Sequence, residues 1–193
     1  MKTAIKRLLF VVLFSMVATS YAHKSSVEIS LGGITTLVFT NVKNGHQYRI
    51  IDEFGTVLYR ETITRNGAFS KRFDFTALKD GAYTLELEKD FEIHITPFIM
   101  QKKQITFLKH CERITFKPVV RLEKDKLLIS QLSLEGASLD IELLYNGERI
   151  LKDEIVDGQV LNKVYQLSSK EKGNYDLRMV TGDRLFLKTF TLF

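Results

Sequence analysis

The single cysteine and its two neighbours come closest, by residue type, to a metal site. His110, Cys111 and Glu112 are consecutive and offer an imidazole, a thiol and a carboxylate, all of which zinc accepts as ligands. Consecutive residues of a strand point to opposite faces, so these three side chains cannot all reach one ion. Cys111 as a nucleophile would need an activating base, and only His110 is near in sequence. We interpret the segment as a loop with an incidental thiol and keep a zinc site at His110 and Cys111 as the alternative.

His23 is a second candidate ligand, because it becomes the first residue of the mature chain if the leader described below is removed. An N-terminal histidine can chelate copper through its amine and imidazole, and in this respect the chain resembles sandwich-fold copper monooxygenases. Such a site needs a second histidine, for which His46, His94 and His110 are available. We predict His94 on the water-facing side of a strand and His46 in a turn. We therefore interpret His23 as a solvated terminus and predict no cofactor.

The carboxylates do not form a recognisable catalytic pattern. Glu86, Glu88, Asp90 and Glu92 alternate with other residues and are most simply the solvated faces of strands. A pair of carboxylates that hydrolyses glycosides is the alternative, because their separation in space cannot be read from the sequence. The sequence contains no G-x-S-x-G, no H-E-x-x-H and no phosphate-binding glycine loop. We predict a protein that is not an enzyme and has no catalytic residues.

The first 22 residues have the pattern of a secretory signal peptide. Three basic residues precede an apolar run over residues 8–18, and Ser20 and Ala22 place small residues at positions −3 and −1 of a cleavage site. The apolar run is shorter than the roughly 20 residues that span a bilayer, which disfavours the alternative of a membrane anchor. We predict cleavage after Ala22, a secreted, periplasmic or cell-surface location, and no transmembrane segment in the mature chain.

Charge and cysteine content exclude one class of partner and one source of stability. Removal of Lys2, Lys6 and Arg7 with the leader reduces the formal net charge from +5 to +2. Binding to a phosphate backbone requires a strongly basic surface, so we predict no nucleic-acid partner. A single cysteine leaves an exported chain without an internal disulfide, so its stability must come from buried apolar side chains.

Hydrophobic periodicity predicts an all-β protein. In "AYTLELE" (82–88), "SLDIELLY" (138–145) and "NYDLRM" (174–179), apolar and polar residues alternate, as in a strand with one dry and one wet face. Short turn signals rich in Gly, Asn and Asp recur along the chain, for example "KDG" at 79–81 and "NG" at 146–147. Short strands at this spacing favour an antiparallel β-sandwich.

An internal repeat sets the predicted domain organisation. Glycine and apolar positions recur at an offset of 92 residues, whereas polar positions differ. The matching pairs include Gly55 and Gly147, Gly81 and Gly173, Tyr83 and Tyr175, Ile93 and Leu185, and Phe98 and Phe190. We predict a signal peptide (1–22), a first β-sandwich repeat (23–98), a structured connector (99–117) with a strand-like piece from residue 104 to 108, and a second repeat (118–193).

The residues around each glycine and tyrosine of the repeat resemble the corner that leads into strand F of immunoglobulin-like sandwiches. Tyr83 lies two positions before Leu85, and Tyr175 two positions before Leu177. The resemblance implies two tandem immunoglobulin-like domains in which each tyrosine hydroxyl binds backbone a few residues upstream. The chain has no tryptophan and one cysteine, so it lacks the core residues of antibody domains.

A second resemblance concerns secreted proteins of Gram-negative bacteria. "YRIIDEFGTVLYRETI" (48–63), "FDFTALKDGAYTLELE" (73–88) and "EIHI" (92–95) resemble small sandwich modules of such proteins, in particular the C-terminal sorting domains of type IX secretion. This resemblance implies a secretion cargo whose last domain acts as a sorting signal.

The C-terminal segment "RLFLKTFTLF" (184–193) is apolar on both faces of its predicted strand. We predict Leu185 and Leu187 on the inward face and Phe186 and Phe190 packed against the other domain or the connector. Phe186, Phe190 and Phe193 are also a candidate docking edge, because a strand that is apolar on both sides can bind another strand. The sequence thus favours a non-enzymatic binding or structural module of the cell envelope with an unidentified protein or glycan partner.

Overall fold

The computed structural model describes residues 27–28, 34–156, 158–168 and 170–193. Its regular elements are antiparallel β strands and two short 3-10 helices, so the all-β prediction is confirmed. Within these ranges no helix has the length and apolar character that crossing a membrane requires. The predicted signal peptide, its cleavage site and His23 lie outside the described residues.

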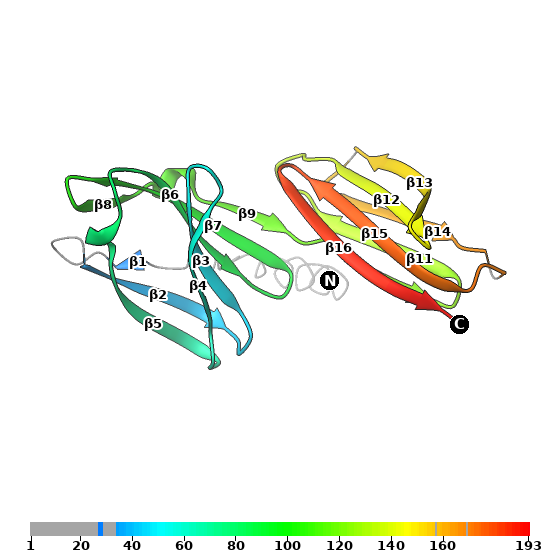
Figure 1. The fold of residues 1–193 in the computed structure, drawn as a ribbon, viewed down its shortest axis with the longest axis horizontal. Helices are drawn as coiled ribbons and strands as arrows, with labels where there is room; N and C mark the ends of the chain where they lie inside the picture. Colours follow the sequence, from blue (N-terminus) through cyan, green and yellow to red (C-terminus); the bar gives the residue numbers. More distant parts are fainter. Residues whose placement is uncertain (1–26, 29–33, 157, 169) are drawn as a thin grey trace, which may run out of the picture.

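The first half of the chain, from β1 to β9, forms two sheets (Figure 1). Its elements are β1 (Val27–Glu28), β2 (Ile34–Val42), β3 (Gln47–Asp52), β4 (Val57–Thr62), β5 (Gly67–Asp74), η1 (Phe75–Ala77), β6 (Gly81–Glu88), β7 (Glu92–Gln101), β8 (Gln104–Phe107), η2 (Lys109–Cys111) and β9 (Arg113–Phe116). The strand orders are β1-β2-β5 and β4-β3-β6-β7-β8, and β9 also pairs with β7.

The second half, from β10 to β16, repeats this arrangement. Its strands are β10 (Val119–Glu123), β11 (Lys126–Leu132), β12 (Leu139–Tyr145), β13 (Glu148–Ile155), β14 (Val160–Gln166), β15 (Gly173–Thr181) and β16 (Arg184–Leu192). They form the sheets β10-β11-β14 and β13-β12-β15-β16, in the order of β1-β2-β5 and β4-β3-β6-β7. The strand order therefore repeats along the chain, as the motif spacing indicated.

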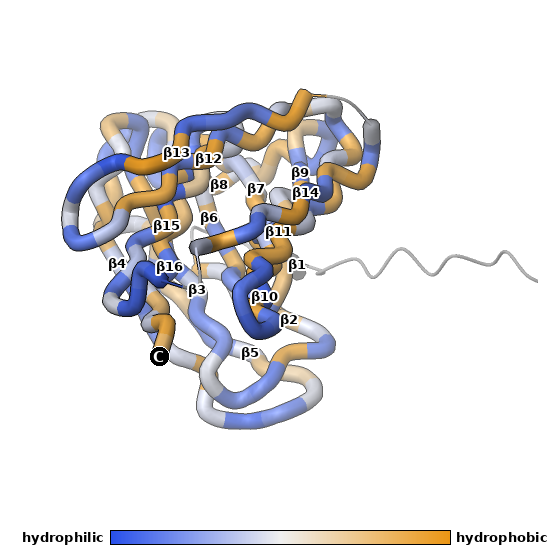
Figure 2. The backbone as a smooth tube through the Cα atoms, turned by 90° about the vertical axis from the view of Figure 1, so that its right-hand side faces the viewer, coloured by the Kyte–Doolittle hydropathy of each residue, from blue (hydrophilic) through white to orange (hydrophobic). Residues whose placement is uncertain are grey.

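Each half buries its own apolar side chains. Alternation along β6 sends Leu85 and Leu87 into one core, and alternation along β15 sends Leu177 and Met179 into another. Figure 2 shows hydrophilic and hydrophobic residues alternating over short stretches of the strands. The buried residues of each core come from one half only, so each half supplies its own hydrophobic stabilisation.

The connector predicted at 99–117 packs as strands against the first half. β7 continues past residue 98 to Gln101 and turns directly into β8, with Phe98 opposite Phe107. After η2 the chain returns as β9, which pairs with the beginning of β7. β7 therefore has β6 on one side and both β8 and β9 on the other.

The C-terminal strand has the opposite phase to the one predicted. Phe186 and Phe190 pack on the core of their own half, and not on the other half or the connector, so that prediction is wrong. Leu185 and Leu187 are 58% and 67% exposed, so their predicted inward orientation is also wrong. The physical reason is register: β15 sets the phase by placing its inward Met179 opposite Phe186. Phe193 is 97% exposed.

Both corner tyrosines bind backbone four residues upstream. The Tyr83 hydroxyl donates to the Lys79 carbonyl at 2.9 Å, and the Tyr175 hydroxyl donates to the Glu171 carbonyl at 2.7 Å. Each ring also stacks on the next strand, Tyr83 on Phe98 and Tyr175 on Phe190. The two halves thus share the same local geometry at equivalent positions.

The repeated glycines differ in what they do. Gly55 and Gly147 have φ of 84° and 85° in equivalent turns, a conformation that residues with a Cβ rarely adopt. A Cβ on Gly173 would lie 3.2 Å from the ring of Tyr145, whereas one on Gly81 would meet nothing closer than 3.7 Å. Gly55 and Gly147 are therefore required by their backbone conformation, and Gly173 by the nearby ring of Tyr145.

Replacing Tyr175 with phenylalanine is expected to lower the free energy of unfolding by about 1 kcal/mol, the scale of one net hydrogen bond. The corresponding change at Tyr83 is expected to cost less, because its hydroxyl is exposed and water can replace it. Urea titration of both variants measures the two losses. An unchanged midpoint for Tyr175→Phe would show that the corner bond does not stabilise the fold.

Candidate functional site

The structure does not bring the predicted metal ligands together. His110 and Cys111 lie in η2, a 3-10 helix and not a strand, and Cys111 is a free, exposed thiol. In the part of the chain that the structure describes, no group of three or more His, Cys, Asp or Glu residues could hold a metal ion. His23 lies outside that part, so its role stays a prediction.

Two histidines are buried, of which His94 was predicted on a water-facing side and His46 in a turn. His94 is 8% exposed, and its Nε2 lies 2.7 Å from Oε1 of Glu92, so its predicted place on a wet face is wrong. His46 is 5% exposed; its Nδ1 accepts the backbone N–H of Lys43, and its Nε2 faces Asp90 at 3.4 Å. His46 thus holds the backbone of the neighbouring turn, and His94 holds the Glu92 carboxylate.

The most deeply buried charge among the described residues is Glu86 on β6, where the sequence predicted a solvated carboxylate. Glu86 is 2% exposed, and that prediction is wrong. Arg49 Nε donates to Glu86 Oε2 at 2.7 Å, and Arg184 Nη1 donates to the same oxygen at 3.1 Å. Arg184 Nη2 donates to Oε1, so Arg184 binds the carboxylate with both nitrogens of its fork. We call Arg49, Glu86 and Arg184 the joint cluster.

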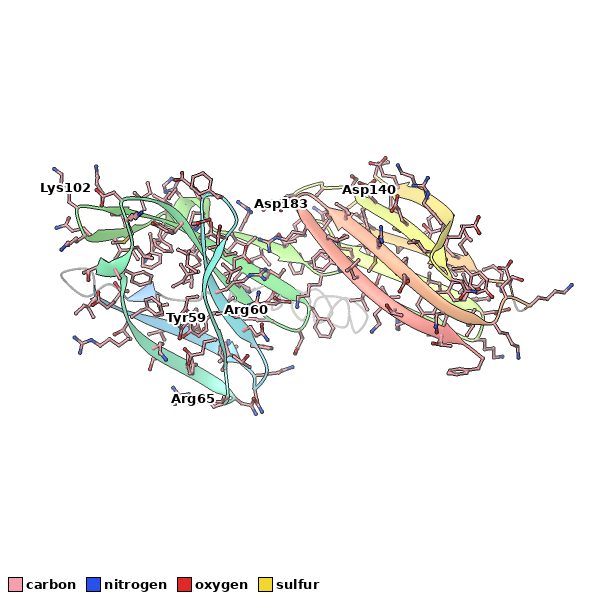
Figure 3. The ribbon with its side chains drawn as sticks, in the orientation of Figure 1. Tyr59, Arg60, Arg65, Lys102, Asp140 and Asp183 are labelled. Carbon is pink, nitrogen blue, oxygen red and sulfur yellow. The ribbon has the colours of Figure 1, made fainter. Side chains whose placement is uncertain are left out.

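The joint cluster connects the two halves of the chain. Arg49 on β3 is directly opposite Glu86 on β6, so the sheet register supplies this pair. Arg184 is the first residue of β16 and lies 98 residues from Glu86 in sequence. Arg184 follows the turn between β15 and β16, in which Gly182 has a φ of 58°. At this turn the second half contacts the first half, because Arg184 reaches Glu86. Asp183, the neighbour of Arg184, lies at the end that faces the first half (Figure 3).

The charges of the joint cluster stabilise one another. Burial alone would raise the pKa of Glu86, but the hydrogen bonds from Arg184 and Arg49 outweigh it and hold this pKa below its ordinary value. The hydrogen bond to Glu86 raises the pKa of Arg184 further above neutrality. Glu86 and Arg184 are therefore both charged at neutral pH, and a carboxylate held this way is poorly suited to exchange protons.

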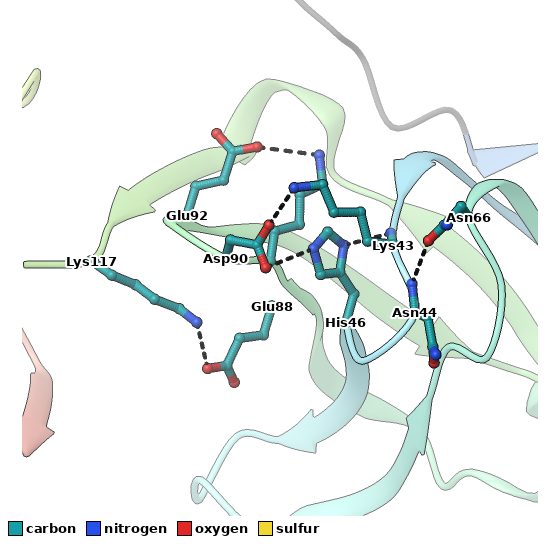
Figure 4. A network of polar contacts seen from close by, with 9 residues as sticks. Lys43, Asn44, His46, Asn66, Glu88, Asp90, Glu92 and Lys117 are labelled. Carbon is teal, nitrogen blue, oxygen red and sulfur yellow. Dashed lines mark hydrogen bonds and ion pairs between the residues drawn. The ribbon is translucent and has the colours of Figure 1, made fainter. Parts of the chain in front are cut away.

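Further ion pairs surround the joint. Lys117, in the segment between β9 and β10, binds Glu88 at 2.8 Å, and its backbone N–H donates to the Phe91 carbonyl. Lys43 binds Asp90 at 2.7 Å. Figure 4 shows Lys43 and His46 converging on Asp90, and Lys117 reaching Glu88. These contacts fix the β6–β7 turn and the start of the second half.

A separate polar cluster lies within the first half. Glu61 on β4 accepts hydrogen bonds from the hydroxyls of Tyr59 and Tyr48, and the Lys71 ammonium lies 2.9 Å from its Oε2. These contacts, led by the Tyr59 hydrogen bond, lower the pKa of Glu61 to about 2. The cluster joins three strands across a half-buried surface.

Acid is expected to weaken the protein partly through Glu61. Its pKa falls from an ordinary 4.5 to about 2 on folding, so its stabilisation is complete above the ordinary value and is lost as the pH falls towards 2. In urea titrations across this window, Glu61→Gln is expected to show a shallower decline than the wild type. The exposed Glu148→Gln variant is the control. A decline identical in all three proteins would contradict this role for Glu61.

Sequence reasoning missed the joint cluster for a clear reason. The alternation along β6 places Glu86 in the polar phase, and nothing local indicates that this phase is covered. The only signal was a carboxylate opposite an arginine in two strands that pair, which is also common on open surfaces.

No protein-family model matches the chain, and no curated protein matches it. Among solved structures, the tetra-tandem repeat in the extending region of a large adhesion protein is 14% identical with a TM-score of 0.30, covering 86% of this chain and 48% of that one. The BSP domain of a biofilm-associated protein is 12% identical with a TM-score of 0.29, covering 81% and 27%. Extracellular domains 3–5 of Drosophila OTK are 9% identical with a TM-score of 0.22, covering 83% and 91%. The chain spans less than half the length of the first two structures.

Proposed function

We propose that the chain is an exported, non-enzymatic structural module of the bacterial cell envelope, formed by two tandem immunoglobulin-like β-sandwich domains. The observation that carries the proposal is the joint cluster, in which Arg184 of the second half binds the buried Glu86 of the first. Separating these charges would leave a carboxylate without one of its two partners, which is costly in a buried setting. The halves are therefore held in one orientation, as a spacer or a presenting module requires.

The strand order supports the immunoglobulin-like assignment. Each half combines a three-stranded sheet with a second sheet in which the strand bearing the corner tyrosine is central. Tyr83 and Tyr175 each stand near the start of that strand and bind backbone upstream, as in the tyrosine corner of such sandwiches.

The state of the carboxylates supports a non-enzymatic role. Glu61, Glu86 and Asp153 all have a pKa below the ordinary value, and each is bound by basic or tyrosine side chains. General acid–base catalysis near neutral pH needs the opposite, a carboxylate whose pKa is raised towards 7. The leader pattern in residues 1–22 supports export.

Two measurements test this proposal. When a Gram-negative host produces the full chain, the processed protein is expected in the periplasmic or surface fraction, beginning at His23. Small-angle X-ray scattering of the purified mature chain is expected to fit one fixed arrangement of the halves, and Arg184→Ala is expected to broaden it. Retention in the cytoplasm, or a wild-type curve that only a wide ensemble fits, would refute the proposal.

A further inference from the structure

β16 has a bare edge where its counterpart in the first half is covered. Among the described residues, β16 pairs only with β15. Its counterpart β7 pairs with β6 and, on its other side, with β8 and β9. The backbone groups along the outer side of β16 therefore have no strand partner in the described chain, which makes this edge a template for an added strand.

The first half shows what kind of strand fits such an edge. In β8, Ile105 and Phe107 lie opposite Met100 and Phe98, and both are almost fully buried, at 8% and 7% exposure. At the offset of 92 residues, Phe98 and Met100 correspond to Phe190 and Leu192 of β16, which are only partly buried. An antiparallel strand with apolar residues at alternate positions would complete the second core in the same way.

Lys188 distinguishes the bare edge from the covered one. It is exposed and lies between Phe186 and Phe190 in the inward phase of β16, whereas the corresponding Thr96 of β7 is 6% exposed. An inward-pointing lysine on an edge strand disfavours pairing with a second copy of the same strand. β16 contains no Asp or Glu, so a second β16 could not neutralise Lys188 in any register.

A concave surface lined by both apolar and charged side chains, among them Asp140, Glu142 and Lys152, lies on the outer face of this sheet. Leu185 and Leu187, on the outer face of β16, line this pocket, which has a volume of about 600 Å³, together with Val180 and Arg178 of β15. Side chains of a strand added beside β16 would lie next to these two exposed leucines and cover them. Both faces of β16 thus gain burial from the same occupant.

We propose that the β16 edge binds an antiparallel strand of a partner protein that carries a carboxylate opposite Lys188 and apolar residues two positions to either side, opposite Phe186 and Phe190. The proposal deepens the proposed function and rests on it, since a non-enzymatic module acts by what it holds. Lys188 then has two effects, because it excludes a second copy and selects an acidic partner.

Nine-residue peptides test the edge directly. The probe has isoleucine at positions 3 and 7, threonine elsewhere and glutamate at position 5; the comparison peptide has lysine at position 5. Fluorescence anisotropy with the purified mature chain is expected to show about fivefold tighter binding of the glutamate peptide, the scale of one cross-strand charge pair. Lys188→Glu is expected to reverse the preference, whereas Lys170→Glu, the same charge change at an exposed site in a loop, is expected to leave it unchanged.

Binding is expected to slow hydrogen exchange of β16 amides. Equal affinity for the two peptides, an unchanged preference in Lys188→Glu, or no binding of either peptide would overturn the proposal. If neither peptide binds and Lys188→Thr self-associates in sedimentation, Lys188 only guards the edge. None of these outcomes alters the fractionation and scattering results, so failure here is distinguishable from failure of the proposed function.

Discussion

Replacing Glu86 with alanine is expected to lower the free energy of unfolding by about 3 kcal/mol, at the lower end of the cost of breaking a buried ion pair. The change leaves Arg49 and Arg184 facing each other without their shared carboxylate. The cost is held to the lower end because their side chains retain some water, with 22% and 16% exposure. Urea titration at neutral pH and low salt measures the loss.

Two comparisons make this expectation specific. Glu88→Ala removes a carboxylate that is 36% exposed and pairs with Lys117, so it is expected to cost at most about 1 kcal/mol. A double-mutant cycle between Glu86→Ala and Arg184→Ala isolates the contact between the halves. A coupling energy near zero, with normal additivity, would show that the joint cluster does not hold the halves together in solution.

The strands and their cores followed from the sequence because alternation is a local property. The pattern of residues 82–88 correctly placed Leu85 and Leu87 inside, since a strand with one dry face must turn its apolar residues towards it. The same pattern failed for Glu86, because covering of the polar face depends on Arg184, far away in sequence. His94 failed for another reason: it lies opposite the inward Leu87 on β6 and therefore on the core face of β7, a register that the sequence does not show.

β16 shows a different limit. Alternation predicts a phase only when one phase is polar, and in residues 184–193 Leu185 and Leu187 compete with Phe186 and Phe190. Register with β15 decides between them, and register depends on the turn and on the neighbouring strand. The repeat offers a partial remedy: at the offset of 92 residues, the inward Phe98 indicates an inward Phe190.

Comparison of equivalent positions in the two halves distinguishes the residues that the fold requires from the residues that differ with the surroundings of each half. Positions equivalent in the two halves keep the same role where they fill a core, as the stacked pairs of Tyr83 with Phe98 and Tyr175 with Phe190 show. They differ where a surface is covered in one half and open in the other. Thr96 and Lys188 are such a pair. Thr96 lies on β7, whose edge is covered by β8 and β9, whereas Lys188 lies on β16, whose edge is bare in the described chain.

The covered and bare edges are expected to give unequal costs for the same substitution. Phe98 is fully buried, and its ring contacts those of Phe75, Tyr83 and Phe107 at centroid distances of 5.3, 5.4 and 5.4 Å. Phe98→Ala is therefore expected to lower the free energy of unfolding by about 4 kcal/mol, within the range for large aromatic truncations in a core.

Phe190→Ala removes the same side chain at the equivalent position but is expected to cost only about 2 kcal/mol, because less buried surface and a smaller cavity are involved. Its ring stacks on Tyr175 alone, and no strand of the described chain covers its other side. Urea titration of the two variants under one set of conditions gives the comparison. Equal losses would mean that Phe190 is as enclosed as Phe98 in solution, so that the edge of β16 is already occupied. A cost for Phe190→Ala that rises when the glutamate peptide saturates the protein would instead show that a bound strand encloses this residue.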